Sequence, residues 1–347
     1  MTPLNVTGAA HARGLAQARL APDSIPAVRA MVAGRLEGAA ALLAQPRIRR
    51  FLAAQRDHAD RHDAEGIAEM DGIAKGYGLD PDDLLAFLHA GQLSGVPDDG
   101  CTAWAFAHPA LGAIVVKNRD LRGPALPLQR LFLHQDPAWG TRRVLCVGSL
   151  GAPGAYSSGI NSDGFALVDT QVVSTDQGVG LLRYFLMTRL LAHCASVAEA
   201  VDMLHATTHV GGGTLVIADA TGAMASVELG HRAIAIERPD GLWTARTNHF
   251  LSLTLRDRLA DRTGADVSLA RLATLTAWLA ARPSCPTTAE AAGIMASHDA
   301  KDYTGLCRHG GATHSTTVSG AIFTCAAGTL DFTHGNPCDG LRSHHAV

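Results

Sequence analysis

The sequence predicts an α+β protein in which two β-sheets pack between layers of helices. Three observations carry this prediction. Apolar residues recur at helical spacing through most of residues 1–100, runs of strand patterns follow Gly100, and groups of helical segments interrupt those runs. No internal repeat or linker separates the parts. We therefore expect a mainly helical segment, 1–100, and a mixed segment, 101–347, to form one compact unit.

The helices expected before Gly100 have recognisable starts and ends. Pro26 stands in the first turn of one helix, Gly76-Tyr77-Gly78 ends another, and Asp80 caps a third. Residues 1–22 are expected to be partly extended. The helices should cover residues 25–44, 46–57, 63–76 and 80–89.

After Gly100 the apolar pattern changes to strand spacing. The strands expected are 102–107, 113–117, 131–134, 143–148, 156–160, 165–168, 214–218, 224–229, 232–237, 243–245, 313–319, 321–324 and 329–333. The helices expected are 181–193, 197–205, 252–261, 267–282 and 288–298. Ser196 and Glu199 form a capping box for the helix over residues 197–205. Residues 343–345 are expected to be frayed.

Composition narrows the class of protein. Charged residues make up 18% of the chain, apolar residues 47%, and the formal charge is −3. No long Lys/Arg cluster points to nucleic acid, and no apolar run is long enough for a membrane span. The N-terminus lacks the pattern of a secretory signal. We expect a cytoplasmic protein without nucleic-acid or membrane partners.

The seven cysteines are scattered and contain no Cys-x-x-Cys pair. This pattern favours reduced thiols over a disulfide framework or a zinc ribbon. His58 and His62 stand four residues apart, as a metal pair can. Their charged neighbours make a solvated helix face the simpler interpretation, and we expect no metal.

Cys101 has a local context that suggests chemistry. A turn-forming acidic segment ends at Gly100, and a strand pattern begins at once. If the Gly100–Cys101 bond is cut, Cys101 gains an α-amine, which titrates near pH 8 and can act as a base beside the nucleophilic thiol. Glycine allows the thiolate to approach its own preceding carbonyl. Thr102 adds a hydroxyl next to the site.

Three other motifs offer partners for Cys101. If the first two strands form a hairpin, Asn118 and Asp120 lie beside Cys101, where Asp120 can orient the ammonium or the thiol. Asn248 can donate to an oxyanion or cap a helix. Arg308 can hold a carboxylate or lie on the surface. His249 is an alternative base, although a lone histidine is more often structural.

Together these residues resemble the acyl-coenzyme A:6-aminopenicillanic acid acyltransferase family of N-terminal nucleophile hydrolases. The resemblance extends from about Glu65 to Thr333. Its motifs, in order, are Glu69-Met70-Asp71-Gly72, Asp82-Asp83-Leu84-Leu85, Asp99-Gly100-Cys101-Thr102, Gly159-Ile160-Asn161-Ser162-Asp163-Gly164, Thr247-Asn248-His249-Phe250 and Cys307-Arg308-His309. Arg119 departs from the family, whose members often carry an aromatic residue before the aspartate.

The resemblance implies a four-layer αββα sandwich, made as a precursor that cuts itself between Gly100 and Cys101. It implies Cys101 as nucleophile, Asp120 as orienting carboxylate, Asn248 as oxyanion donor and Arg308 as a supporting residue, and Thr102, Asn118 and Asn161 are further supporting candidates. The substrate is then a small N-acyl amide or an acyl thioester. No cofactor is needed, although acyl-coenzyme A is a possible substrate.

The cleaved segment 1–100 would remain as a heterodimer partner of the chain that begins at Cys101. Two alternatives stay open. One is a binding module that keeps the fold without turnover. The other is a Cys/His/Asn peptidase that uses His249 as its base.

Overall fold

Two β-sheets form the centre of the computed structural model, which describes residues 1–95, 99–121, 126–260, 265–298, 305–310 and 315–347. The first sheet has eight strands in the order β1-β4-β5-β6-β7-β8-β9-β10. Only its β1–β4 pair is parallel. Its strands are β1 (Leu4–Thr7), β4 (Gln129–Gln135), β5 (Arg143–Ser149), β6 (Ser158–Asn161), β7 (Ala166–Thr170), β8 (Thr214–Ala218), β9 (Met224–Leu229) and β10 (Ile234–Glu237).

The second sheet is antiparallel and has six strands in the order β11-β2-β3-β12-β13-β14. They are β2 (Asp99–His108), β3 (Gly112–Leu121), β11 (Trp243–Arg246), β12 (Thr316–Thr324), β13 (Thr329–His334) and β14 (Arg342–Ala346). Its hairpin β2–β3 confirms and extends the expected hairpin of residues 102–107 and 113–117.

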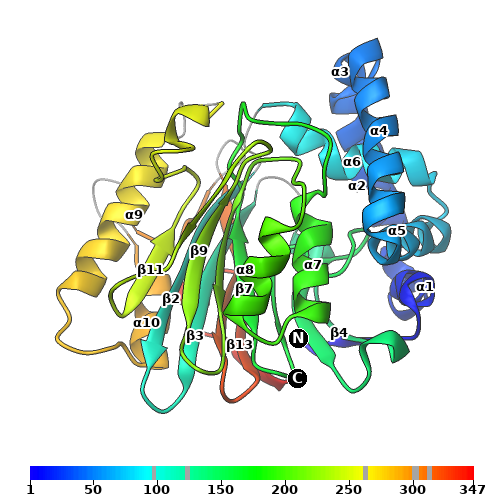
Figure 1. Cartoon of the computed structure of the whole chain (residues 1–347). Coiled ribbons are helices and arrows are strands. Elements are labelled where there is room, and N and C mark those ends of the chain that lie inside the picture. The colour runs from blue at the N-terminus through cyan, green and yellow to red at the C-terminus, as the bar shows by residue number, and fades with distance from the viewer. Residues whose placement is uncertain (96–98, 122–125, 261–264, 299–304, 311–314) are drawn as a thin grey trace.

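Helices cover the outer faces of both sheets (Figure 1). On the second sheet lie α9 (Ala265–Ala280) and α10 (Thr288–Met295). The remaining helices lie on the side of the first sheet: α1 (Ala10–Leu20), α2 (Ile25–Gly38), α3 (Ala40–Leu43), α4 (Pro46–His62), α5 (Ala64–Tyr77), α6 (Pro81–Leu93), α7 (Arg183–His193) and α8 (Val197–His205). Short 3-10 turns are η1 (Pro22–Ser24), η2 (Leu126–Leu128), η3 (Pro137–Trp139), η4 (Arg256–Arg258) and η5 (Pro337–Asp339).

The alternation of side chains on β2 separates two of the cores. Trp104 and Phe106 pack outward with Leu275 of α9 and Met295 of α10. Ala103 and Ala105 face inward, where the two sheets meet around Val147, Val168 and Phe323. A further core packs α5 and α7 against the first sheet. Because successive residues of a strand point to opposite faces, this pattern fixes the αββα order of layers.

Segment 1–100 contacts the rest of the protein through a strand of the first sheet and buried ion pairs, as well as through its helices. β1 pairs in parallel with β4, and α1 lies so close to α5 that a Cβ on Gly14 would come within 2.1 Å of the carbonyl oxygen of Glu69. Arg13, which is 1% exposed, pairs with Glu69 at 3.2 Å and also with Asp136 beyond β4. The segment is therefore built into the sandwich.

Several sequence expectations needed correction. Residues 1–22 form α1 as well as the extended β1, and residues 252–261 contain only the turn η4 instead of a helix. The C-terminal residues 343–345, expected to be frayed, belong to β14, which pairs with β13 along its length. The two strands expected at 313–319 and 321–324 are one strand, β12, with a register shift between Thr317 and Ser319. Pro97, Asp98, Asp261 and Thr313 lie outside the described residues.

Among the described residues, no helix combines the length and apolar composition of a membrane span.

Candidate active site

Gly100 and Cys101 lie at the start of β2, directly beside β3. The register pairs Gly100 with Asp120, Cys101 with Arg119 and Thr102 with Asn118. Residues opposite one another on antiparallel strands have side chains on the same face. Gly100 and Asp120 therefore share the outer face toward α9, whereas Cys101 and Arg119 share the inner face between the sheets. The Asp120 carboxylate and the Cys101 thiol therefore lie on opposite faces of the sheet at the Gly100–Cys101 peptide bond.

Asp120 is fully buried on this outer face. Its Oδ1 accepts a hydrogen bond of 2.7 Å from Thr317 Oγ1, and its Oδ2 has no hydrogen-bond partner among the described residues. A Cβ on Gly100 would lie 3.1 Å from that Oδ2. Burial raises the pKa of Asp120, although the nearby charges of Arg271 and Arg308 oppose this shift. The unpaired carboxylate oxygen thus faces the Gly100 side of the peptide bond and not the thiol.

Asn248 contacts the backbone of Cys101 directly. Its Oδ1 accepts a hydrogen bond of 2.8 Å from the Cys101 N–H, and its Nδ2 donates to the carbonyl of Gln171 at 2.9 Å. Its own N–H donates to Ser268 Oγ at 2.8 Å. An amide nitrogen carries two hydrogens, so Nδ2 keeps a second donor for an oxyanion. The Asn248 side chain therefore offers a hydrogen-bond donor at Nδ2 and, at Oδ1, an acceptor for the backbone N–H of Cys101.

Arg271 of α9 is a site residue that sequence reasoning missed. It is 2% exposed and donates to the Cys101 carbonyl at 2.5 Å, to Thr102 Oγ1 at 2.9 Å and to Asn248 Oδ1 at 2.7 Å. Burial lowers its pKa, and Asp120 opposes that shift. In the sequence this arginine reads as an ordinary polar position of the expected helix 267–282. The spacing could have indicated that Arg271 is buried, because Arg271, Leu275 and Leu279 follow one another at intervals of four residues on one face of the helix.

Arg308 reaches the site from the segment 305–310. Its backbone N–H donates to Thr317 Oγ1 at 2.8 Å, and its carbonyl accepts from the Thr317 N–H at 2.9 Å. A Cβ on Gly100 would lie 3.5 Å from Nη1 of Arg308. The same Cβ would lie 3.1 Å from Asp120 Oδ2, so the structure places Arg308 and Asp120 on the same side of Gly100.

Two of the other supporting candidates, Thr102 and Asn118, lie in the site. Thr102 accepts from Arg271, and Asn118 Nδ2 ties β3 to the carbonyls of Met295 and Leu306 at 2.9 and 2.7 Å. Both lie in the site as structural contacts.

Asn161 does not lie in the site, contrary to expectation. It pairs with Val144 of β5, whereas Ser149 at the other end of β5 contacts Arg119. Five residues of strand span about 16 Å. The Asn161 side chain instead bonds the carbonyls of Leu191 and Cys194 at 2.8 and 2.7 Å, which ties β6 to α7.

Arg119, opposite Cys101, makes the inner face polar. It is 4% exposed, and its guanidinium donates to Gln129 Oε1 at 3.1 Å and Ser149 Oγ at 3.2 Å. It lies 5.8 Å from the ring centroid of Tyr156. This face of the site therefore carries a buried positive charge that neutral groups hold in place.

The His249 ring is buried beside the hydroxyl groups of Ser268 and Thr247. Its Nδ1 lies 2.8 Å from Ser268 Oγ and 3.2 Å from Thr247 Oγ1. Burial, assisted by the charge of Arg271, lowers the pKa of His249 to about 4. An imidazole with that pKa is a weak general base at neutral pH.

Comparison with protein families gives one decisive match. The model described as acyl-coenzyme A:6-aminopenicillanic acid acyl-transferase matches residues 109–339, which is more than half of the chain. The chain belongs to this family. The match includes Asp120, Asn248 and Arg308 and begins after Cys101. No match was found among curated proteins.

Solved structures also align with this chain. A variant of conjugated bile acid hydrolase from Clostridium perfringens aligns with a TM-score of 0.47 and 12% identity, over 71% of this chain and 97% of the other. Penicillin V acylase from Agrobacterium tumefaciens aligns with a TM-score of 0.43 and 14% identity, over 67% and 83%. The two packed sheets between layers of helices in this acyl-transferase family member agree with the αββα sandwich expected from its sequence.

Proposed function

We propose that this protein is a self-processing N-terminal cysteine enzyme that hydrolyses or transfers the acyl group of a small N-acyl amide or acyl thioester. The observation that carries the proposal is the hydrogen bond from the Cys101 N–H to Asn248 Oδ1, beside the unpaired Oδ2 of Asp120. A new α-amine at Cys101 would find one acceptor already in contact and a carboxylate nearby. The family's description as acyl-transferases supports the same chemistry.

In the precursor, the Cys101 thiol attacks the Gly100 carbonyl and the peptide C–N bond breaks. The acyl group moves from nitrogen to sulfur, and the nitrogen takes up the proton that sulfur releases. Water then cleaves the thioester, which releases the carboxyl group of Gly100 and restores the thiol. Arg271 and Asn248 hold Cys101 during this step, because both contact its backbone.

In the mature enzyme, the α-amine removes the thiol proton, and Cys101 attacks the substrate carbonyl. The second hydrogen of Asn248 Nδ2 stabilises the oxyanion, an interaction whose loss typically costs about 3–4 kcal/mol. The α-ammonium returns the proton to the substrate's amine or thiol, which leaves, and water or an acceptor amine then resolves the acyl-enzyme. The amine base needs no metal or cofactor, and acyl-coenzyme A fits as a donor of the thioester kind.

The excised segment 1–100 should stay bound as a partner of the mature chain. β1 is hydrogen-bonded to β4, and the buried Arg13 pairs with Asp136. Glu69 Oε1 accepts a hydrogen bond of 2.9 Å from the Gly154 N–H. Separation of the two pieces would leave these buried groups unpaired. We also propose a cytoplasmic location, which keeps the Cys101 thiol reduced.

Intact-mass measurement tests the processing step. Wild type should separate under denaturing conditions into two pieces that end at Gly100 and begin at Cys101, and the pieces should co-elute under native conditions. Cys101→Ala should stay full length, and Cys285→Ala should process as wild type does. A single full-length species in wild type, with a spectrum that matches Cys101→Ala apart from the substitution, would favour the binding module.

Acyl transfer is tested with the matured protein. A panel of N-acyl amides and acyl-coenzyme A donors should yield an acyl adduct on the piece that begins at Cys101, seen by mass spectrometry after acid quench. Donors with a carboxylate or polar acyl chain should react fastest because of Arg119. Absence of any adduct and any turnover across the panel would contradict the enzymatic role.

A further inference from the structure

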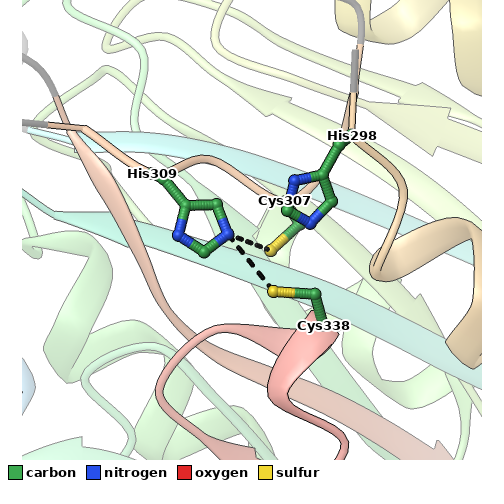
Figure 2. Close-up of side chains that lie close together, drawn as sticks. All are labelled: His298, Cys307, His309 and Cys338. Carbon is green, nitrogen blue, oxygen red and sulfur yellow. Dashed lines mark hydrogen bonds between the residues drawn. The ribbon is translucent and has the colours of Figure 1, made fainter. Parts of the chain in front are cut away.

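Four potential metal ligands from three segments meet beside the site. His298 follows α10, Cys307 and His309 lie in the segment 305–310, and Cys338 belongs to η5. One ligand atom of each residue lies within 4.8 Å of the others (Figure 2). In the described part of the chain, no other group of three or more such residues gathers in this way. We propose that His298, Cys307, His309 and Cys338 form a structural zinc site.

The distances fit tetrahedral zinc. Nε2 of His309 lies 3.2 Å from Cys338 Sγ and 3.8 Å from Cys307 Sγ. With zinc–sulfur bonds of about 2.3 Å and zinc–nitrogen bonds of about 2.05 Å, a tetrahedral site separates sulfur from nitrogen by about 3.6 Å. The two observed distances bracket that value. Shifts of a few tenths of an ångström would bring Nε2 of His309 to this separation from both sulfur atoms, and all four ligand atoms lie within 4.8 Å of one another.

Hydrogen bonding alone explains the cluster poorly. One imidazole nitrogen offers either one hydrogen or one lone pair, yet Nε2 of His309 faces two sulfur atoms. A cation at the common centre satisfies all the ligand atoms at once. All seven cysteines lie in the described part of the chain, and none of them forms a disulfide there. Two thiolates with two imidazoles are a ligand set of structural zinc, which leaves no position open for a substrate.

The surroundings provide support and access. Nδ2 of Asn336 donates to Cys307 Sγ at 3.6 Å and to the Arg308 carbonyl at 2.9 Å, and the Cys307 N–H donates to the Ser297 carbonyl at 2.9 Å. Donors to a ligand sulfur orient it and tune the metal site. Cys307 is 5% exposed, whereas His298, His309 and Cys338 are exposed, so an ion can enter from solvent.

The proposed zinc would fix the segment that carries Arg308. Cys307 and His309 flank Arg308 and turn their side chains to the cluster, while Nη1 of Arg308 lies near Gly100 on the other side. The backbone of Arg308 is bonded to Thr317, whose hydroxyl bonds Asp120. The zinc would thus act as a positioning element for Arg308. This consequence rests on the proposed function; the metal site itself does not.

Metal analysis tests the site directly. The protein is purified without a polyhistidine tag, incubated with zinc and freed of excess ion, and zinc is measured by mass spectrometry. Wild type should hold about one zinc per chain, and Cys338→Ser and His309→Ala should hold less than about a tenth of that. Cys285→Ser and His205→Ala serve as matched controls and should keep the wild-type content.

Cobalt substitution gives a second readout. Wild type loaded with Co²⁺ should show the thiolate-to-cobalt charge-transfer absorption, and Cys338→Ser should lose most of it. Wild type with less than about a tenth of a zinc per chain, or variants with undiminished zinc, would overturn the proposal. A Cys307–Cys338 disulfide in freshly purified protein, seen as a mass two hydrogens lower, would also overturn it.

Two further measurements separate this proposal from the proposed function. Cys101→Ala should bind zinc as wild type does, so failure of processing and failure of metal binding are seen independently. Asn336→Ala should weaken zinc affinity about tenfold, as loss of a hydrogen-bond donor to a ligand atom typically does. In processed wild type, removal of zinc by a chelator should slow turnover, and added zinc should restore it. Unchanged turnover would remove the link to Arg308 but not the zinc site.

Discussion

The backbone N–H of Cys101 donates a hydrogen bond of 2.8 Å to Oδ1 of Asn248, a residue 147 positions further along the chain. Arg271 donates both to that same Oδ1 and to the Cys101 carbonyl. Cys101 is therefore held at its nitrogen and its carbonyl oxygen by two neighbouring groups.

Gly100→Ala should slow self-cleavage about tenfold while the fold is kept, since small displacements of reacting groups are costly. The added Cβ would lie 3.1 Å from Asp120 Oδ2, so the Asp120 side chain must move by a few tenths of an ångström, whereas the 3.5 Å to Arg308 Nη1 is an ordinary contact. The rate is followed by denaturing electrophoresis after synthesis. Gly34→Ala in α2 is the matched control, because nothing lies within 4 Å of its Cβ. Equal rates for wild type and Gly100→Ala would show that the contact is unimportant.

Arg271→Lys should reduce both self-cleavage and turnover by roughly a hundredfold, about 2.7 kcal/mol. A lysine ammonium lacks the planar fork with which Arg271 reaches Cys101, Thr102 and Asn248 at once. Arg282→Lys, just beyond the end of α9, is the matched control and should behave as wild type. If Arg271→Lys processes normally with an unchanged melting temperature, the role assigned to Arg271 is wrong.

Asn248→Ala should lower kcat by about 10²–10³ with a smaller change in KM, because the donor acts mainly on the developing oxyanion. Self-cleavage should slow as well, since the contact to the Cys101 N–H is lost. The neighbouring variant His249→Gln is the control and should retain turnover, because its low pKa makes His249 a poor base. An Asn248→Ala enzyme with full kcat would contradict its role as oxyanion donor, whereas a His249→Gln enzyme without turnover would point to the peptidase alternative.

Asp63 should make stability depend on pH. This residue caps α5, is 8% exposed, and burial raises its pKa from 3.8 to about 6. A raised carboxyl pKa penalises the folded state above pH 6, and the penalty is relieved as the pH falls through 6. Between pH 7.5 and 5, wild type should therefore gain about 1.4 kcal/mol relative to Asp63→Asn. Urea unfolding of both proteins at the two pH values measures this difference. A constant difference would contradict the shifted pKa.

Much of the fold could be predicted from local patterns. The alternation around Trp104 and Phe106 and the turn before Gly112 predicted the β2–β3 hairpin, and Gly76-Tyr77-Gly78 predicted the end of α5. β14 was missed because its residues, such as Arg342 and His344, are polar and exposed at an edge. In place of the helix expected at 252–261, Glu228 accepts from the backbone of Leu251 and Ser252, and the turn η4 follows.

Some residues of the site could likewise be predicted from the sequence, and others could not. Cys101 and Asp120 were accessible from the sequence because a hairpin places them close together, and a family resemblance added Asn248 and Arg308. Arg271 looks like an ordinary helix residue until α9 is seen to turn it toward Cys101. Asn161, although part of a recognisable motif, ties β6 to α7 far from the other site residues.

The sequence by itself determined the class of fold and the hairpin that places Asp120 beside the Gly100–Cys101 bond, because strand and helix periodicity and tight turns are local properties. The tertiary structure alone decided which distant groups meet. It brings Asn248 and Arg271 to the backbone of Cys101, and it gathers His298, Cys307, His309 and Cys338 into one cluster. Contacts of this kind depend on the packing of layers, and spacing along the chain does not encode them.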